Sequence, residues 1–304
     1  MANVLSALQI QQILFAYVEA IAAYTSRFAR VCPIRPVQQG EVRVSRGAFG
    51  GVANTLAAGA TTSVVSDVAT FESTFGTAHR YVQHKMPTFK TLDDKALTQM
   101  GQALAQVWLK NVDREIGSGI EGLLSAPSAR AGTGVGRVGA SKNFFDTAKK
   151  GLQGEGGEFQ YANLVASALG EAALDSALQQ LIAWRDDRGL QMNLGRGGNL
   201  ALVHTAAQQS LATKLTGSNV TDHDLQKNWR SGMFGGGLVP WEFGDPDVSI
   251  VVDCDVSPFF YGLAGTPNIE VHSYEAMFTT FLVEYDGAFI VSPYEYGAVA
   301  LQAD

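Results

Sequence analysis

The chain has 304 residues and a formal net charge of −7, a length that suggests roughly two domains and a charge that argues against a reader of nucleic-acid sequence. Charged residues make up 17% of the chain against a typical ~25%, which indicates that neighbouring molecules cover part of the surface. Two cysteines, Cys32 and Cys254, cannot build a disulfide framework, so we expect both to be reduced.

Residues 3–31 are predicted to form an apolar helix. The segment lacks the basic start of a signal peptide, and its glutamines and Glu19 interrupt it too often for a membrane span, so we expect a soluble intracellular protein. Its large apolar residues recur at alternating steps of four and three, the heptad spacing of a helix that packs on a partner. That partner is either its own domain or a neighbouring subunit. The stripe consists of Ile10, Leu14, Tyr17, Ile21, Tyr24, Phe28 and Val31.

Two strand-like segments, Glu41–Arg46 and Thr70–Met86, enclose a stretch without any charge, Gly47–Ser66. We predict a long β-hairpin arm with this stretch as its tip. Exposed apolar side chains are a liability on a solvated loop, so we expect an adjacent subunit to cover the tip. The apolar residues of the tip are Phe49, Val52, Leu56, Val64 and Val65.

A long amphipathic helix is predicted over Thr91–Leu124, with Thr91 as its cap and Asp93 and Asp94 at the positive end of its dipole. At ~1.5 Å per residue it would be roughly 45 Å long, so we interpret it as a spine that spans the subunit. Its apolar stripe is Leu97, Met100, Leu104, Val107, Val112, Ile116, Ile120 and Leu123.

Helices and strands alternate in the rest of the chain. Residues 126–157 are rich in Gly, Ser and Ala, and 217–244 read as a polar, Gly-rich loop. Helices are predicted at 143–150, 161–188 and 205–215, the last ended by Gly217. Strands are predicted at 199–204, 248–254, 259–263, 269–273, 278–285 and 288–291, with Asp286–Gly287 as a hairpin turn and a last apolar run at 299–301.

No catalytic, cofactor or metal motif stands out. The glycines of GTGVGRVG at 132–139 have the G-x-G-x-x-G spacing, but no apolar strand precedes them, so a flexible loop is the better interpretation. The histidines show no ligand spacing; His223, for example, lies between aspartates in a polar loop. Asp253 and Asp255 could serve a metal or act as a general base, although such residues more often cap a strand.

The order of these parts resembles the major capsid proteins of tailed bacteriophages, which have the Hong Kong 97-type fold. LTQMGQALAQVWLKNVDREIGSGI at 97–120 is similar to that family's helix after the extended loop. Residues 169–189 and 199–215 look like its helix, central strand and following helix, and 283–301 resemble its closing strands. The resemblance covers most of the chain and rests on architecture and weak motifs.

The resemblance implies an α+β fold with an N-terminal arm, an extended β-hairpin loop, a long spine helix, a peripheral domain and an axial domain. The function would be to self-assemble into hexamers and pentamers of an icosahedral shell around double-stranded DNA. The implied ranges are 1–36 for the arm, 37–90 for the extended loop, 91–150 for the spine helix and peripheral domain, 151–265 for the axial domain and 266–304 for the closing strands of the peripheral domain.

The resemblance also implies partners and a location. The partners would be other copies of the chain, a portal, separate scaffolding or decoration proteins and non-specifically contacted DNA, with no membrane; the location would be the virion capsid, assembled in the host cytoplasm. Some members cross-link through a lysine of the extended loop, but the first lysine here is Lys85, beyond the tip. We therefore expect no such cross-link.

Two alternatives stay open. A nanocompartment shell of the same fold, similar to encapsulins, would house an enzyme instead of a genome. A soluble enzyme would use the 217–255 region with Asp253 and Asp255. The assembly interface that we predict consists of Ile10, Leu14, Tyr17, Ile21, Tyr24, Phe28, Phe49, Val52, Leu56, Val64 and Val65.

Overall fold

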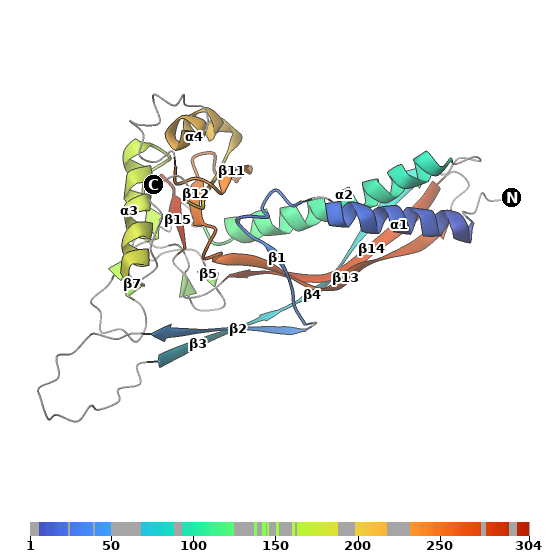
Figure 1. Cartoon of the computed structure of the whole chain (residues 1–304), viewed down its shortest axis with the longest axis horizontal. Helices are drawn as coiled ribbons and strands as arrows, with labels where there is room; N and C mark the ends of the chain where they lie inside the picture. The colour runs from blue at the N-terminus through green and yellow to red at the C-terminus, as the bar shows by residue number, and fades with distance from the viewer. Residues whose placement is uncertain are drawn as a thin grey trace, which may run out of the picture. The chain divides into compact units, whose positions relative to one another are not determined.

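The chain has a mixed α and β fold, which confirms the predicted class (Figure 1). It divides into two compact units, each built from segments that are far apart in the sequence. Unit 1 comprises Met1–Val42, Gly76–Glu121 and Phe259–Val291; unit 2 comprises Arg43–Phe75, Gly122–Pro258 and Ser292–Asp304. The computed structural model describes residues 6–23, 25–38, 40–49, 68–87, 93–124, 137–138, 142–143, 145, 150–151, 160–161, 163–187, 198–217, 232–274, 278–291 and 297–303.

Unit 1 contains a four-stranded sheet in the order β1-β13-β14-β4. Its strands are β1 (Ile34–Pro36), β4 (Ala78–Pro87), β13 (Phe259–Tyr274) and β14 (Phe278–Val291). β14 pairs antiparallel with both β13 and β4, whereas β1 pairs parallel with β13. Side chains alternate along β14 between buried and half-buried, so one face of this sheet lies in the core.

The predicted turn at Asp286–Gly287 is wrong, because β14 runs through both residues. Gly287 serves a different purpose: a Cβ at this position would overlap the side chain of Tyr261 on the neighbouring strand. The two strands predicted at 259–263 and 269–273 are likewise one strand, β13, whose register shifts between Ala264 and Asn268. Gly265, with φ +80°, lies in this irregular stretch.

Two helices of unit 1 lie side by side along this sheet (Figure 1). The long helix α2 (Asp94–Glu121) has 28 residues, which confirms a long helix within the predicted range Thr91–Leu124. The Asp93 carboxylate accepts a hydrogen bond from the Ala96 N–H and so caps its start, whereas the predicted cap, Thr91, lies outside the described residues. The predicted stripe is buried at Leu97, Leu104, Val112, Ile116, Ile120 and Leu123, together with Trp108.

The N-terminal helix is shorter than predicted: α1 spans Ala7–Ala23. It begins after a capping box in which Ser6 N–H donates to the Gln9 side chain and Gln9 N–H donates to the Ser6 hydroxyl. After α1, the Ser26 hydroxyl accepts a hydrogen bond from the Phe28 N–H and donates one to the Asp113 carboxylate of α2. The serine side chain thus bonds a backbone N–H that would otherwise bond within a helix, which favours a turn over further helix. Among the described residues, no helix is long and apolar enough to cross a membrane.

Unit 2 contains a five-stranded sheet in the order β11-β10-β12-β15-β9. Its strands are β9 (Leu164–Val165), β10 (Leu200–His204), β11 (Gly237–Pro240), β12 (Ser249–Asp253) and β15 (Ala298–Leu301). Every residue of β10, β12 and β15 is buried. Helix α3 (Glu171–Asp187), the 3-10 helix η3 (Ala206–Gln208) and helix α4 (Gln209–Thr216) belong to the same unit, and Gly217 ends α4 at φ +73°, as predicted.

Two predictions for unit 2 are wrong. The helix predicted at 161–188 begins only at Glu171, because Leu164–Val165 pairs as a strand with β15. The final strand, Ala298–Leu301, belongs to this sheet and not with β13 and β14, so the range 266–304 is not one set of closing strands.

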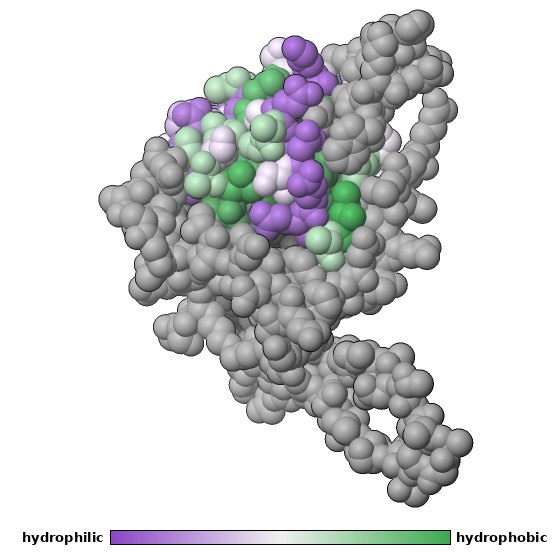
Figure 2. Space-filling model, turned by 90° about the vertical axis from the view of Figure 1, so that its left-hand side faces the viewer, coloured by the Kyte–Doolittle hydropathy of each residue, from purple (hydrophilic) through white to green (hydrophobic). Residues whose placement is uncertain are grey.

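On the face that Figure 2 shows, which includes the side where α3 lies, a band of hydrophilic residues runs between hydrophobic ones.

Three further pairs of strands are described. β2 (Glu41–Phe49) and β3 (Val68–Gly76) form a two-stranded sheet, so the predicted first strand is confirmed. The second strand, predicted as one run over Thr70–Met86, is divided between β3 and β4, which belong to different sheets. β5 (Arg137–Val138) pairs with β6 (Lys142–Asn143), and β7 (Lys150–Gly151) pairs with β8 (Gln160–Tyr161). Most of the helix predicted at 143–150 lies outside the described residues.

Candidate assembly surface

The inner face of α1 packs closely on α2 within unit 1. A Cβ at Gly101 of α2 would overlap the Ile13 carbonyl oxygen and lie 2.8 Å from both Ala16 Cβ and Tyr17 N. Ile13, Ala16 and Tyr17 are buried, and burial raises the pKa of the Tyr17 phenol above its usual range. This face of the helix is therefore covered by its own subunit.

The outer face of α1 carries large apolar side chains in contact with solvent. Leu8 and Phe15 are each 67% exposed and Val18 is 57% exposed. Together with exposed Gln11 they follow steps of three and four, the spacing of a helix that offers a seam to a partner. Exposed apolar side chains that gather on one face are typical of an interaction surface.

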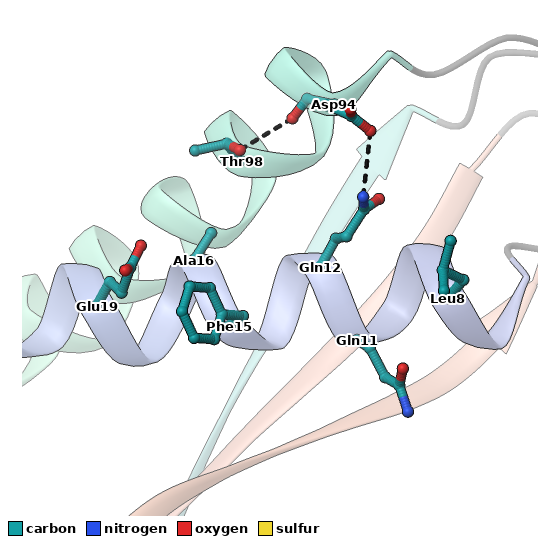
Figure 3. Close-up of a pocket in the computed structure, with 8 residues that line it drawn as sticks. All are labelled: Leu8, Gln11, Gln12, Phe15, Ala16, Glu19, Asp94 and Thr98. Carbon is teal, nitrogen blue, oxygen red and sulfur yellow. Dashed lines mark hydrogen bonds between the residues drawn. The ribbon is translucent and has the colours of Figure 1, made fainter.

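A groove runs beside this outer face, between α1 and the first turn of α2 (Figure 3). At its edge Gln12 Nε2 donates to Asp94 Oδ1 at 3.1 Å, and the Thr98 hydroxyl donates to the Asp94 carbonyl oxygen at 2.9 Å. The groove is lined by Leu8, Gln11, Gln12, Phe15, Ala16 and Glu19 of α1 and by Asp94 and Thr98 of α2.

The structure places the predicted interface residues in different environments. Tyr17 and Phe28 are buried, and Ile10, Leu14 and Ile21 are half-buried. Tyr24, the side chain of Phe49, and Val52, Leu56, Val64 and Val65 lie outside the described residues, so their role stays a prediction. Sequence reasoning missed Leu8, Phe15 and Val18, although they follow the same heptad spacing in a neighbouring register.

The residues suspected of chemistry hold the fold together. Asp253 is fully buried, and its carboxylate accepts hydrogen bonds from Arg185 Nε at 2.5 Å and Nη2 at 2.6 Å. Asp255, 54% exposed, accepts a further hydrogen bond from Nη2 at 3.1 Å. Burial disfavours the guanidinium, but the hydrogen bonds and charges of the two aspartates outweigh it and raise the pKa of Arg185. The pair thus joins α3 to the end of β12.

A second carboxylate joins α2 to the sheet of unit 1. Glu115 accepts hydrogen bonds from the Tyr261 hydroxyl at 2.6 Å and the Tyr285 hydroxyl at 2.8 Å. Arg80 Nε lies 2.8 Å from the Glu115 carboxylate, in an ion pair whose N–H is not aligned for a hydrogen bond. Burial, strengthened by Glu115, raises the pKa of both tyrosines far above the ordinary range.

The other candidate motifs provide no site among the described residues. That part of the chain contains no group of three or more His, Cys, Asp or Glu side chains that could hold a metal ion. His223 and most of GTGVGRVG lie outside the described residues, and Arg137–Val138 of that motif is a short strand. Where the predicted 217–244 loop is described, Gly235 and Gly236 approach the backbone of Gly198 and Leu200, which a side chain would prevent.

The fold is similar to that of two solved structures over nearly the whole chain, and a third match is weaker. A virus-like particle protein from Pyrococcus furiosus is 12% identical with a TM-score of 0.51, and the match covers 96% of this chain and 98% of that chain. A phage-related protein from Bordetella bronchiseptica is 13% identical with a TM-score of 0.51, covering 94% and 95%. The mature capsid of bacteriophage PhiM1 is 12% identical with a TM-score of 0.49, covering 92% and 87%.

Neither a protein-family model nor a curated protein sequence matches the chain. At these identities the likeness establishes the fold and leaves the finer assignment open. The chain therefore has the fold of the Pyrococcus furiosus virus-like particle protein and of the Bordetella bronchiseptica phage-related protein.

Proposed function

We propose that this chain is the major shell protein of a phage-like particle, which self-assembles into hexamers and pentamers that enclose double-stranded DNA. One observation carries the proposal: the match to the Pyrococcus furiosus virus-like particle spans 96% of this chain and 98% of that one. The role is structural, without catalysis, and the N-terminal arm and the extended loop take the ranges 1–36 and 37–90.

Two surfaces serve self-association in this proposal. The first is the outer face of α1, because Leu8, Phe15 and Val18 remain exposed in the single subunit. The second is the tip Gly47–Ser66, on the strength of its charge-free sequence. A portal and separate scaffolding or decoration proteins are the further partners expected of such a shell.

The test is whether the purified full-length protein forms closed particles. Sedimentation and negative-stain electron microscopy should show shells, or hexamers and pentamers, alone or with a supplied scaffold. Monomers and dimers across a wide concentration range, with scaffold present, would contradict the proposal. The contents decide between the two kinds of shell: nuclease-protected DNA supports the phage-like head, and a co-purifying enzyme supports a nanocompartment.

The outer face of α1 allows a sharper test than deletion of the arm, which would also remove buried Tyr17 and Phe28. Phe15→Asp places a charge on a side chain that is 67% exposed, so the subunit should fold normally. In an interface that charge would be buried without a partner, at a cost of several kcal/mol in each copy. Particle yield should therefore fall at least about tenfold. Leu211→Asp on α4, where Leu211 is 38% exposed, is the matched control.

A further inference from the structure

The two faces of unit 1 differ in charge, which the net charge of −7 conceals. On α2, the exposed positions from Lys95 to Ser118 bear lysine, arginine, glutamine, threonine or serine and no carboxylate. The two carboxylates of that segment are occupied: Asp113 is buried beside Arg27, and Glu115 faces the tyrosines of the sheet. We call the exposed set the cationic strip; it consists of Lys95, Gln99, Gln102, Gln106, Lys110 and Arg114.

The three cations of the strip form no ion pair within the part of the chain that the structure describes. Lys95, Lys110 and Arg114 make no ion pair or hydrogen bond there through their side chains. Asp113 is paired with Arg27 at 3.3 Å, and the Arg27 side chain is itself 50% exposed. Exposed carboxylates also occur on the two helices, at Glu19 of α1 and at Asp93 and Asp94, which precede Lys95 at the start of α2. The strip thus offers positive charge to an external partner.

The opposite face of the same sheet is acidic. Arg80 and Tyr285 point towards Glu115 of α2, so their neighbours in the strands point away from the helix. Glu284 and Asp286 lie on this far face, with Glu270 on the adjoining strand in register with Leu282. His79 contacts both Glu284 and Asp286, and Lys85 lies 4.8 Å from the centre of the Phe278 ring. Arg35 of β1 also lies on this far face, over the Phe260 ring. The strip of α2 is therefore positive, whereas the far face around Glu270, Glu284 and Asp286 is acidic.

We propose that the cationic strip of α2 binds the phosphate backbone of the enclosed nucleic acid, so that the helix face of unit 1 turns towards the shell interior. The inference rests on the proposed function. From Lys95 to Arg114 the strip extends about 28 Å, enough to meet several successive phosphates of a duplex. Lysine and arginine supply charge and the glutamine amides supply hydrogen-bond donors, a combination that contacts phosphate without reading bases.

The acidic far face supports the same orientation, because carboxylates repel phosphate while the strip attracts it. Binding through the strip should depend on salt and not on sequence, since each phosphate neutralised releases counterions. A shell repeats the strip in every subunit, so weak contacts from each copy add over a long polymer. This accounts for DNA enclosure by a chain whose net charge is negative.

The experiment compares two double variants of the full-length protein that change net charge equally. Lys110→Gln with Arg114→Gln alters the strip; Lys85→Gln with Lys214→Gln alters exposed lysines on the sheet of unit 1 and on α4. Binding of a short fluorescent duplex of arbitrary sequence to the unassembled fraction is measured by anisotropy over a salt series, and particle formation is measured separately by sedimentation.

The strip variant should bind about tenfold or more weakly at about 0.1 M salt, and the slope of log affinity against log salt should fall by about 0.9 per cation removed. The control variant should bind like the wild type. Equal losses in both variants, or a wild type that forms particles yet does not bind duplex, would overturn the inference. So would tighter binding to polyglutamate than to DNA, which would indicate an acidic protein partner.

These outcomes separate the inference from the proposed function. A wild type that forms no particles but binds duplex through the strip would refute the shell and retain the nucleic-acid surface. Particles from the wild type with strip-independent binding would retain the shell and refute the surface. Circular dichroism of both variants should match the wild type, because all four positions are exposed.

Discussion

Each unit ties a helix to its sheet through one charged side chain, and the two ties are built in opposite senses. In unit 1 the carboxylate, Glu115, is on the helix, and its partners Tyr261, Tyr285 and Arg80 are on three strands. In unit 2 the cation, Arg185, is on the helix, and Asp253 is on the strand. Both arrangements fix how a helix lies on its sheet.

The two ties differ in their access to water. The side chains of Arg185 and Asp253 are 8% and 0% exposed, whereas those of Arg80 and Glu115 are 40% and 21% exposed. Removing one partner from a dry pair leaves the other charge buried, while water can replace a lost partner in a wetter one. The exposure of the paired side chains to water, more than the number of their hydrogen bonds, should therefore determine how much stability is lost when each pair is broken.

The largest effect is expected for Asp253→Ala, which leaves the Arg185 guanidinium buried without the carboxylate that accepts two of its hydrogen bonds. The free energy of unfolding should fall by about 3–5 kcal/mol, measured by urea denaturation. Arg185→Met combined with Asp253→Ala is the control, since it removes both charges and should recover part of the loss. If the single variant lost no more than ~1 kcal/mol, the pair would behave as a surface pair and the comparison would fail.

Glu115→Ala should cost less, about 2–3 kcal/mol, because two tyrosine hydroxyls lose a charged acceptor but part of the site reaches water. Glu115→Gln keeps the shape and one acceptor oxygen, so its loss should be roughly half as large. Urea denaturation again measures both. A loss from Glu115→Ala that exceeded that from Asp253→Ala would show that exposure does not rank the two ties.

Alkaline pH should loosen the tie of unit 1 in particular. Burial and Glu115 raise the pKa of Tyr261 and Tyr285 in the folded state, so the unfolded chain loses these protons first. Their contribution to stability is complete below about pH 10, the ordinary tyrosine pKa, and declines as pH rises above it. The melting temperature should drop above that pH, and Tyr261→Phe with Tyr285→Phe should make the drop shallower. A parallel decline in the variant would contradict this source of the pH dependence.

Features that depend on a local sequence pattern could be predicted, whereas those that depend on contacts between distant residues could not. The spine helix was predictable because a stripe from Leu97 to Ile120 repeats over many turns. The strand at Leu164–Val165 was not, because its partner Ala300–Leu301 is more than a hundred residues away and local sequence favoured helix. Gly287 was mistaken for a turn because a glycine that admits the Tyr261 ring looks identical in sequence to one that bends the chain.

The candidate assembly surface was also predictable only in part. The heptad spacing of residues 3–31 predicted correctly that a helix packs on a partner, but Tyr17 faces α2 while Phe15, two positions away, faces solvent. Because this helix has apolar residues on every face, its sequence does not indicate which face packs against α2. The role of Asp253 was hidden because the pairing depends on Arg185, which is 68 residues away in the chain.

The smallest effect in this series is expected for Asp255→Asn. Its side chain is 54% exposed, and its bond to Arg185 Nη2 at 3.1 Å is longer than the two bonds that Asp253 accepts from the guanidinium. Solvent screens such a contact, and asparagine can still accept a hydrogen bond, so the loss should be under ~1 kcal/mol. The measurement is a double-mutant cycle with Asn199→Ala, because Asn199 Nδ2 donates to Asp255 at 2.7 Å and supports it from the other side. A coupling free energy near zero between Asp255 and Asn199 would indicate that Asp253 alone stabilises the Arg185 site. A loss close to that of Asp253→Ala would instead mean that all three side chains act as one buried network, and that exposure of one member does not lower its share.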